Sequence, residues 1–127
     1  MRSYEQSRAR LAEAKRSLAG GVASTLRGSM KPTPLYAESA SGVIVKDVDG
    51  NEYIDYLLAY GPLILGHAHP EFNARIGRAL AKGITYGLQH DGEIELARRL
   101  TEVLPCADKV ALSGSGTEAV MLALRLA

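Results

Sequence analysis

The sequence has little of several residue types, and each shortage excludes a class of protein. It contains no tryptophan and one cysteine, so Cys106 cannot form a disulfide within the chain. Its 15 lysines and arginines against 14 aspartates and glutamates leave no charged surface suited to nucleic acid or a membrane. No hydrophobic run is long enough to span a bilayer, and the polar first residues lack the apolar segment of a secretory signal. We therefore expect a cytoplasmic protein with no nucleic-acid or membrane partner.

The residues that are present suit a folded domain. Hydrophobic residues make up 46% of the 127 and charged residues 23%, so the composition allows a packed core and does not suggest disorder. Residues 3–19 place Tyr4, Leu11 and Leu18 at seven-residue intervals, which predicts an amphipathic helix ending at the Gly20-Gly21 pair. Residues 22–34 include two prolines and follow no period, which predicts a long irregular segment.

Three short segments with strand-like composition follow, at residues 35–38, 42–47 and 51–56. The Asp49-Gly50 pair between the last two is typical of a hairpin turn, because glycine readily adopts the positive φ that such a turn needs. We predict a small antiparallel sheet.

Two helices are predicted after this sheet. Pro70 suits the first turn of a helix, where its missing N–H costs nothing, and apolar residues at helical spacing continue up to Gly83. A second helix runs from about Gly92 to Leu104 and is ended by Pro105.

The last residues read as a strand, a glycine turn and a helix, at 109–112, 113–116 and 117–127. The final helix is apolar almost all round, which requires burial by further elements. It has no C-terminal cap, so we expect the chain to be part of a longer protein.

The glycine turn allows three interpretations. The start of a helix offers unpaired N–H groups and a positive dipole end, so with the hydroxyls of Ser115 and Thr117 it suits an anion. Alternatively, Ser115 and Glu118 form a capping box, which stabilises the helix and binds nothing. Thirdly, residues 114–119 match the G-x-G-x-x-A dinucleotide pattern, although the acidic residue that would test it falls beyond residue 127.

Three motifs in one order resemble the class III aminotransferases, which are dependent on pyridoxal 5'-phosphate (PLP). They are DVDGNEYIDY at residues 47–56, GPLILGHAHP at 61–70 and SGTEA at 115–119. Within the family the similarity is greatest to the glutamate-1-semialdehyde 2,1-aminomutases and related aminotransferases. The resemblance implies an α/β protein, the N-terminal part of a fold type I PLP-dependent transferase that acts as a homodimer on a small amino or semialdehyde acid.

The resemblance also implies a division of the chain. Residues 1–34 would form an N-terminal helix and active-site loop, 35–60 the hairpin sheet, 61–108 connecting helices, and 109–127 the start of the large PLP-binding domain. A chain that ends naturally here would instead be a non-catalytic interaction fragment.

Site residues follow from the same resemblance. Ser115, Gly116 and Thr117 match the phosphate-binding turn, preceded by Gly114 where relatives usually have asparagine. Arg27 falls near an arginine that pairs with a substrate carboxylate, and the alternative is an exposed loop arginine.

Tyr60 stands where the aminomutases usually have a tryptophan beside the substrate, and the alternative is a core aromatic. Residues 85–90 correspond to a loop that approaches the partner subunit's cofactor.

Two further expectations concern catalysis and metal. No lysine of this chain lies in the sequence context of the Schiff-base lysine, so the 127-residue chain alone should be inactive; the lysines are Lys15, Lys31, Lys46, Lys82 and Lys109. His67 and His69 form an H-x-H pair without an acidic or cysteine companion at ligand spacing, so we expect a structural turn and no metal.

Overall fold

The computed structural model describes residues 2–127 and divides the chain into two compact units, one ending at Ala81 and one spanning Lys82–Ala127. No hydrophobic side chain among these residues is buried. The geometry of the first unit therefore depends on polar contacts, with aspartate carboxylates as the main acceptors. The buried residues are Ser7, Gly21, Thr33 and Asp47.

Helix α1 covers Glu5–Ala14 and is shorter than predicted. The chain leaves it through a turn at residues 15–17, and the short 3-10 helix η1 follows at Ala19–Gly21. Gly21 has a φ of +75°, and a Cβ there would lie 2.8 Å from Cγ of Lys15 and 2.9 Å from Cδ1 of Leu11. The predicted extension to residue 19 is wrong, because this glycine lets the chain fold back against α1 instead of capping a longer helix.

The segment predicted to be irregular contains one helical turn. Helix α2 covers Thr25–Gly28, and the remaining residues up to Leu35 are irregular. Four residues are too few for a hydrophobic period to develop, so the sequence pattern gave no sign of this turn.

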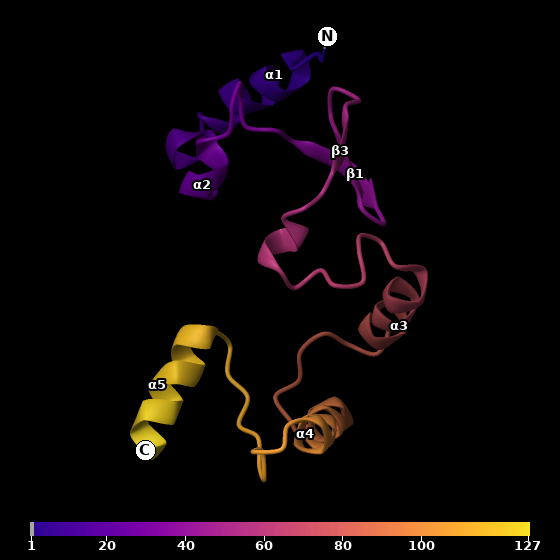
Figure 1. The fold of residues 1–127 in the computed structure, drawn as a ribbon, viewed down its shortest axis with the longest axis vertical. Coiled ribbons are helices and arrows are strands. Elements are labelled where there is room, and N and C mark those ends of the chain that lie inside the picture. The colour runs from indigo at the N-terminus through magenta and orange to yellow at the C-terminus, as the bar shows by residue number, and fades with distance from the viewer. Residues whose placement is uncertain (1) are drawn as a thin grey trace. The chain divides into compact units, whose positions relative to one another are not determined.

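Strands β1 (Ala37–Ser41), β2 (Ile44–Asp47) and β3 (Glu52–Ile54) form an antiparallel sheet in the order β1-β2-β3. Figure 1 labels β1 and β3 of this sheet. The predicted small antiparallel sheet is confirmed. Its first strand begins two residues later than predicted, and the second begins at Ile44 because residues 42 and 43 form the turn between β1 and β2.

The turn between β2 and β3 is closed from the inside by Asp47. Its carboxylate accepts hydrogen bonds from the N–H groups of Asp49 (3.0 Å) and Asn51 (2.8 Å), the Asn51 amide (2.8 Å) and the Tyr53 hydroxyl (2.9 Å). Burial alone would raise the pKa of Asp47, but these hydrogen bonds outweigh it and hold the pKa below its ordinary value. The predicted Asp49-Gly50 turn is confirmed, with Gly50 at a φ of +82°.

Asp49 connects this turn to α1. Its Oδ1 accepts from the N–H of Gln6 at 2.8 Å, and its Oδ2 accepts from the N–H and the hydroxyl of Ser7 at 2.9 and 2.6 Å. The first N–H groups of a helix have no partner within it, so Asp49 caps a helix that lies 42 residues earlier in the chain. The Asn51 amide adds a hydrogen bond to the Ser3 carbonyl at 2.8 Å.

Three longer helices complete the described chain. Helix α3 covers Pro70–Leu80 and starts at its proline, and α4 covers Asp91–Val103, both close to the predicted bounds. Helix α5 covers Gly116–Leu126, and every one of its residues is exposed. No helix among residues 2–127 is long and apolar enough to cross a membrane.

The predicted strand at residues 109–112 is wrong, because these residues are irregular in the structure. A strand needs a hydrogen-bonded neighbour, and no other segment of residues 2–127 pairs with this one.

Candidate functional site

The predicted phosphate-binding turn lies at the start of α5. Ser115 is extended, with φ −155° and ψ 160°, and Gly116 is the first helical residue. The Ser115 hydroxyl accepts from the N–H of Glu118 at 3.3 Å, and the Ser115 carbonyl accepts from the N–H of Ala119 at 3.0 Å. Ser115 therefore caps the helix and forms one half of the predicted capping box, while no hydrogen bond from the Ser115 N–H to the Glu118 carboxylate is found among residues 2–127.

This cap leaves donors for an anion. The N–H groups of Gly116 and Thr117 and the Thr117 hydroxyl have no hydrogen-bond partner among residues 2–127. They lie at the positive end of the dipole of an 11-residue helix. The Ser115 cap therefore does not exclude an anion at the same turn, and the free donors suit a phosphate group.

Gly114 gives the Glu118 side chain room to fold back over this turn. A Cβ on residue 114 would lie 3.0 Å from Oε2 of Glu118. An asparagine, which the resemblance leads one to expect here, would require the Glu118 carboxylate to move.

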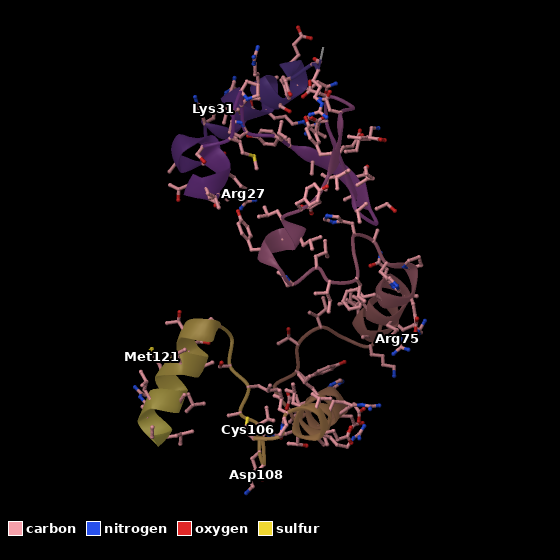
Figure 2. All side chains as sticks on the ribbon, in the orientation of Figure 1. Arg27, Lys31, Arg75, Cys106, Asp108 and Met121 are labelled. Atoms are coloured by element: carbon pink, nitrogen blue, oxygen red, sulfur yellow. The ribbon has the colours of Figure 1, made fainter. Side chains whose placement is uncertain are left out.

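Arg27 lies on α2, and Figure 2 marks it there with Lys31 a short distance further along the chain. Its side chain is exposed, and its guanidinium forms no ion pair or hydrogen bond with a side chain of residues 2–127. The Tyr36 hydroxyl donates to the Gly21 carbonyl at 3.4 Å and so connects the segments on either side of α2. The guanidinium is thus exposed at the surface of the first unit and available to bind a carboxylate at its two oxygens.

Tyr60 lies in a left-handed segment between the sheet and α3. Leu58, Ala59 and Tyr60 have φ values of +49°, +52° and +68°, and Gly61 follows at +109°. The left-handed region costs a residue with a Cβ about 1–2 kcal/mol, so three in succession store appreciable backbone strain. Tyr60 is 60% exposed among the described residues.

Asp55 and His67 close the loop that contains this segment. Oδ1 of Asp55 accepts from the N–H groups of Leu57 and Leu58 at 2.8 and 3.1 Å, and Oδ2 lies 2.7 Å from Nε2 of His67. The hydrogen bond from His67 holds the pKa of Asp55 below its ordinary value, and the two N–H groups act in the same direction.

The other two histidines cap helices. Nδ1 of His69 accepts from the N–H of Phe72 at the start of α3, and Nδ1 of His90 accepts from the N–H of Gly92 at the start of α4. Each side chain of the H-x-H pair therefore has a structural partner. Residues 2–127 contain no group of three or more potential metal ligands.

The segment 85–90 is held by its own aromatic residues. The rings of Tyr86 and His90 stack with centroids 5.1 Å apart, and the Tyr86 hydroxyl donates to the Lys82 carbonyl at 2.6 Å. Its expected approach to a partner's cofactor stays a prediction.

A pocket of about 450 Å³ lies on the sheet, and it does not include the predicted site residues of the first unit. Its charged groups are Asp47 and Asp55, and both carboxylates are already used in hydrogen bonds. Most of its remaining lining is apolar, including Met30, Leu35, Val45, Ile54 and Leu57.

Lys46 has an environment that is unsuited to a nucleophilic amine. Its Nζ lies 2.9 Å from Oε2 of Glu38, and the hydrogen bond and charge of that carboxylate raise the pKa of Lys46. A nucleophilic lysine requires a lowered pKa.

The structure places the predicted site residues in different units. Arg27 and Tyr60 belong to the first unit, and Ser115, Gly116 and Thr117 belong to the second. Sequence reasoning missed the Asp55–His67 pair. The closely spaced Gly61 and Gly66 were the available signal of a tight loop whose ends meet.

Residues 26–127 match the sequence model of a family described as Aminotransferase class-III. A glutamate-1-semialdehyde 2,1-aminomutase from Methanothermobacter thermautotrophicus is 51% identical over 110 residues, which make up 87% of this chain and 26% of that protein. The chain thus spans about a quarter of the length of this curated relative.

Solved structures of transaminases are similar to most of the chain. An omega-transaminase from Sphaerobacter thermophilus has a TM-score of 0.87 and 36% identity, covering 96% of this chain and 28% of that one. A transaminase with PLP bound has a TM-score of 0.88 and 39% identity, covering 97% of this chain and 29% of that one. These similarities confirm the predicted fold class.

Proposed function

The chain belongs to the class III aminotransferase family, and we propose that it forms part of a longer PLP enzyme that moves an amino group on a small amino or semialdehyde acid. The observation that carries this proposal is the family match over residues 26–127, which includes the free donors at the start of α5. The same match gives no support to the dinucleotide interpretation of residues 114–119.

The start of α5 fits the phosphate of PLP. The N–H groups of Gly116 and Thr117 and the hydroxyls of Ser115 and Thr117 would hold its oxygens, and the helix dipole would favour its charge. When bound, PLP supplies an electron sink for the substrate carbon that loses a proton. This chain's own contribution at that end is to bind and orient the cofactor.

Arg27 would bind the substrate carboxylate, and Tyr60 would line the substrate site. A guanidinium donates two parallel hydrogen bonds to a carboxylate, and Arg27 has no acidic partner among residues 2–127 that would compete. An exposed tyrosine on a strained segment suits a residue that contacts a ligand.

Assembly and location complete the proposal. We place the full enzyme in the cytoplasm as a homodimer, with residues 85–90 approaching the partner's cofactor. The same proposal divides the chain after residues 34, 60 and 108 into the N-terminal segment, the hairpin sheet, the connecting helices and the start of the PLP-binding domain.

The test uses the complete protein encoded by the source gene. We expect an absorbance band between about 330 and 430 nm that borohydride changes, as for PLP held by a lysine. Ser115→Ala and Thr117→Val should each weaken retention of PLP. Thr101→Val is the matched control, since the Thr101 hydroxyl donates to a backbone carbonyl within α4. A wild-type protein without the band would contradict the proposal.

The substrate arm compares arginine variants. Arg27→Lys keeps the charge but loses the two-point geometry, so KM for a carboxylate substrate should rise about tenfold with kcat less affected. Arg75→Lys, at an exposed arginine paired with Glu71 on α3, should leave KM unchanged.

Mutase and transferase activities separate by their co-substrate. An aminomutase would convert one semialdehyde acid without an added amino acceptor, whereas an aminotransferase requires an acceptor.

A further inference from the structure

The loop from Asp55 to His67 is attached at both ends to one hairpin turn. The N–H of Asp55 donates to the Val43 carbonyl at 2.8 Å. Gly42 and His67 form a two-way backbone bridge, with N–H to carbonyl distances of 2.9 and 2.8 Å. Asp55 and His67, which are twelve residues apart, are therefore connected in two ways. Their backbones both bond to the β1–β2 turn, and their side chains bond to each other.

The Asp55 carboxylate joins the start of the loop to its end. One oxygen accepts from the N–H groups of Leu57 and Leu58, and the other is bonded to the His67 ring. The left-handed residues begin at Leu58, directly at this acceptor. The side chains of both Asp55 and His67 are mostly buried, with exposed fractions of 14% and 23%.

Backbone hydrogen bonds hold the segment only to its own neighbours. The N–H of Tyr60 donates to the Leu57 carbonyl at 2.9 Å, and those of Gly61 and Leu63 donate to the Leu58 carbonyl at 3.0 and 3.2 Å. Such local bonds move with the segment and do not by themselves fix its position relative to the sheet. The Asp55 carboxylate, held by the His67 ring, accepts from the N–H of Leu58 and so connects this segment to the two ends of the loop.

We propose that Asp55 and His67 form a clasp that keeps Leu58–Tyr60 left-handed and thereby positions Tyr60 in the substrate site. They are positioning residues, and neither touches the reacting atoms. The proposal rests on the proposed function, because it takes Tyr60 as a residue that lines the substrate site. Nothing in the family resemblance of residues 61–70 assigned more to His67 than a structural turn.

The glycine at position 66 supports a tight closure. Gly66 has a φ of +77°, and a Cβ there would lie 2.9 Å from the Gly42 carbonyl oxygen. The chain thus approaches the hairpin turn too closely for any side chain, immediately before His67 contributes its ring to the clasp.

The experiment compares His67 variants of the complete protein with PLP bound. His67→Ala removes the ring that holds the Asp55 carboxylate and leaves the backbone bridge to Gly42 in place, whereas His67→Gln offers a side-chain N–H near the position of Nε2. We expect His67→Ala to raise KM for the amino substrate about tenfold while the PLP band is retained, and His67→Gln to restore much of the loss. Adding Ala59→Gly to His67→Ala should lower KM again, because glycine adopts the left-handed conformation without strain.

Hydrogen exchange supplies a readout that does not depend on activity. The amides of residues 57–63 should exchange faster in His67→Ala than in wild type, and His69→Ala, which removes only the α3 cap, should leave them unchanged. Unchanged exchange of these amides in His67→Ala would overturn the proposal. So would a Tyr60→Ala variant with wild-type KM.

The two hypotheses fail in different ways. A wild-type protein without a PLP band contradicts the proposed function. In that case the hydrogen exchange of residues 57–63 in wild type and His67→Ala still tests whether the clasp holds the segment. A wild-type enzyme whose His67→Ala variant loses PLP and kcat together, with no specific rise in KM, overturns the positioning role.

Discussion

Replacing Asp47 with alanine would remove one carboxylate and leave four hydrogen bonds without an acceptor. The donors are the N–H groups of Asp49 and Asn51, the Asn51 amide and the Tyr53 hydroxyl. Asp47 is 1% exposed, so in the native turn its carboxylate is bonded to these donors and not to bulk water.

The expected cost follows from the number and surroundings of these bonds. A hydrogen bond to a charged acceptor contributes about 1.5–3 kcal/mol, but the donors lie in a surface turn where water can enter the vacated space. We therefore expect the loss of about two such bonds, or roughly 3 kcal/mol for opening of the hairpin. This corresponds to about a 100-fold larger open population.

Asp47→Asn should fall between wild type and alanine. Its Oδ1 can still accept from the two backbone N–H groups. Its amide nitrogen would face the amide of Asn51, so that bond is lost unless Asn51 turns over. Glu38→Gln is the matched control, because Glu38 is an exposed partner of Lys46 on the same sheet and should matter little.

Hydrogen exchange with peptide-level mass spectrometry on the complete protein measures this cost. Peptides covering residues 44–54 should exchange much faster in Asp47→Ala, while those of α4 serve as an internal reference. Exchange of residues 44–54 within twofold of wild type would refute the view that Asp47 holds this turn.

Three further predictions concern glycine, pH and the helix cap. Gly66→Ala should destabilise the first unit by about 2 kcal/mol or more, and Gly50→Ala by only about 1 kcal/mol, because both are left-handed but only residue 66 meets a carbonyl oxygen. The reverse order in local exchange would contradict this. Because the folded pKa of Asp47 is lowered, its stabilisation is complete above about pH 4 and is lost as pH falls through the folded value. Protection of residues 44–54 that already declines near pH 6 would argue against it. Ser115→Ala should destabilise α5 by about 1 kcal/mol, and Ser113→Ala by less, as measured by exchange of the first α5 amides.

Local signals in the sequence predicted the elements that depend on local chemistry. Pro70 marked the start of α3, Asp49-Gly50 marked the turn of the hairpin, and Ser115 marked the start of α5. In each case the residue acts on its own backbone or on that of its near neighbours, so a short stretch of sequence contains the cause.

The missed features depend on residues far apart in the chain. The prediction of a strand at residues 109–112 was wrong because a strand requires a hydrogen-bonded partner, and apolar composition alone cannot supply one. The left-handed conformation of residues 58–60 was invisible because leucine, alanine and tyrosine do not favour positive φ, and closure through Asp55 and His67 accompanies it.

In the candidate site, too, some features have a local cause in the sequence and others do not. The motif SGTEA contains its own donors, so a phosphate turn could be proposed from sequence and its cap found in the structure. The proposed roles of Arg27 and Tyr60 came only from resemblance, because the sequence around them has no pattern that specifies a substrate.

The spacing of Asp47 and Asp49 sets the alignment of the N-terminal helix. One carboxylate fixes the shape of the turn and the other, two residues later, reaches outward to Gln6 and Ser7. An insertion of a single residue between them would leave the strands and α1 each able to form, yet it would rotate the second carboxylate away from the helix. The length of this turn therefore determines where α1 is attached to the hairpin. Lengthening the turn should detach α1 from the hairpin without unfolding either element.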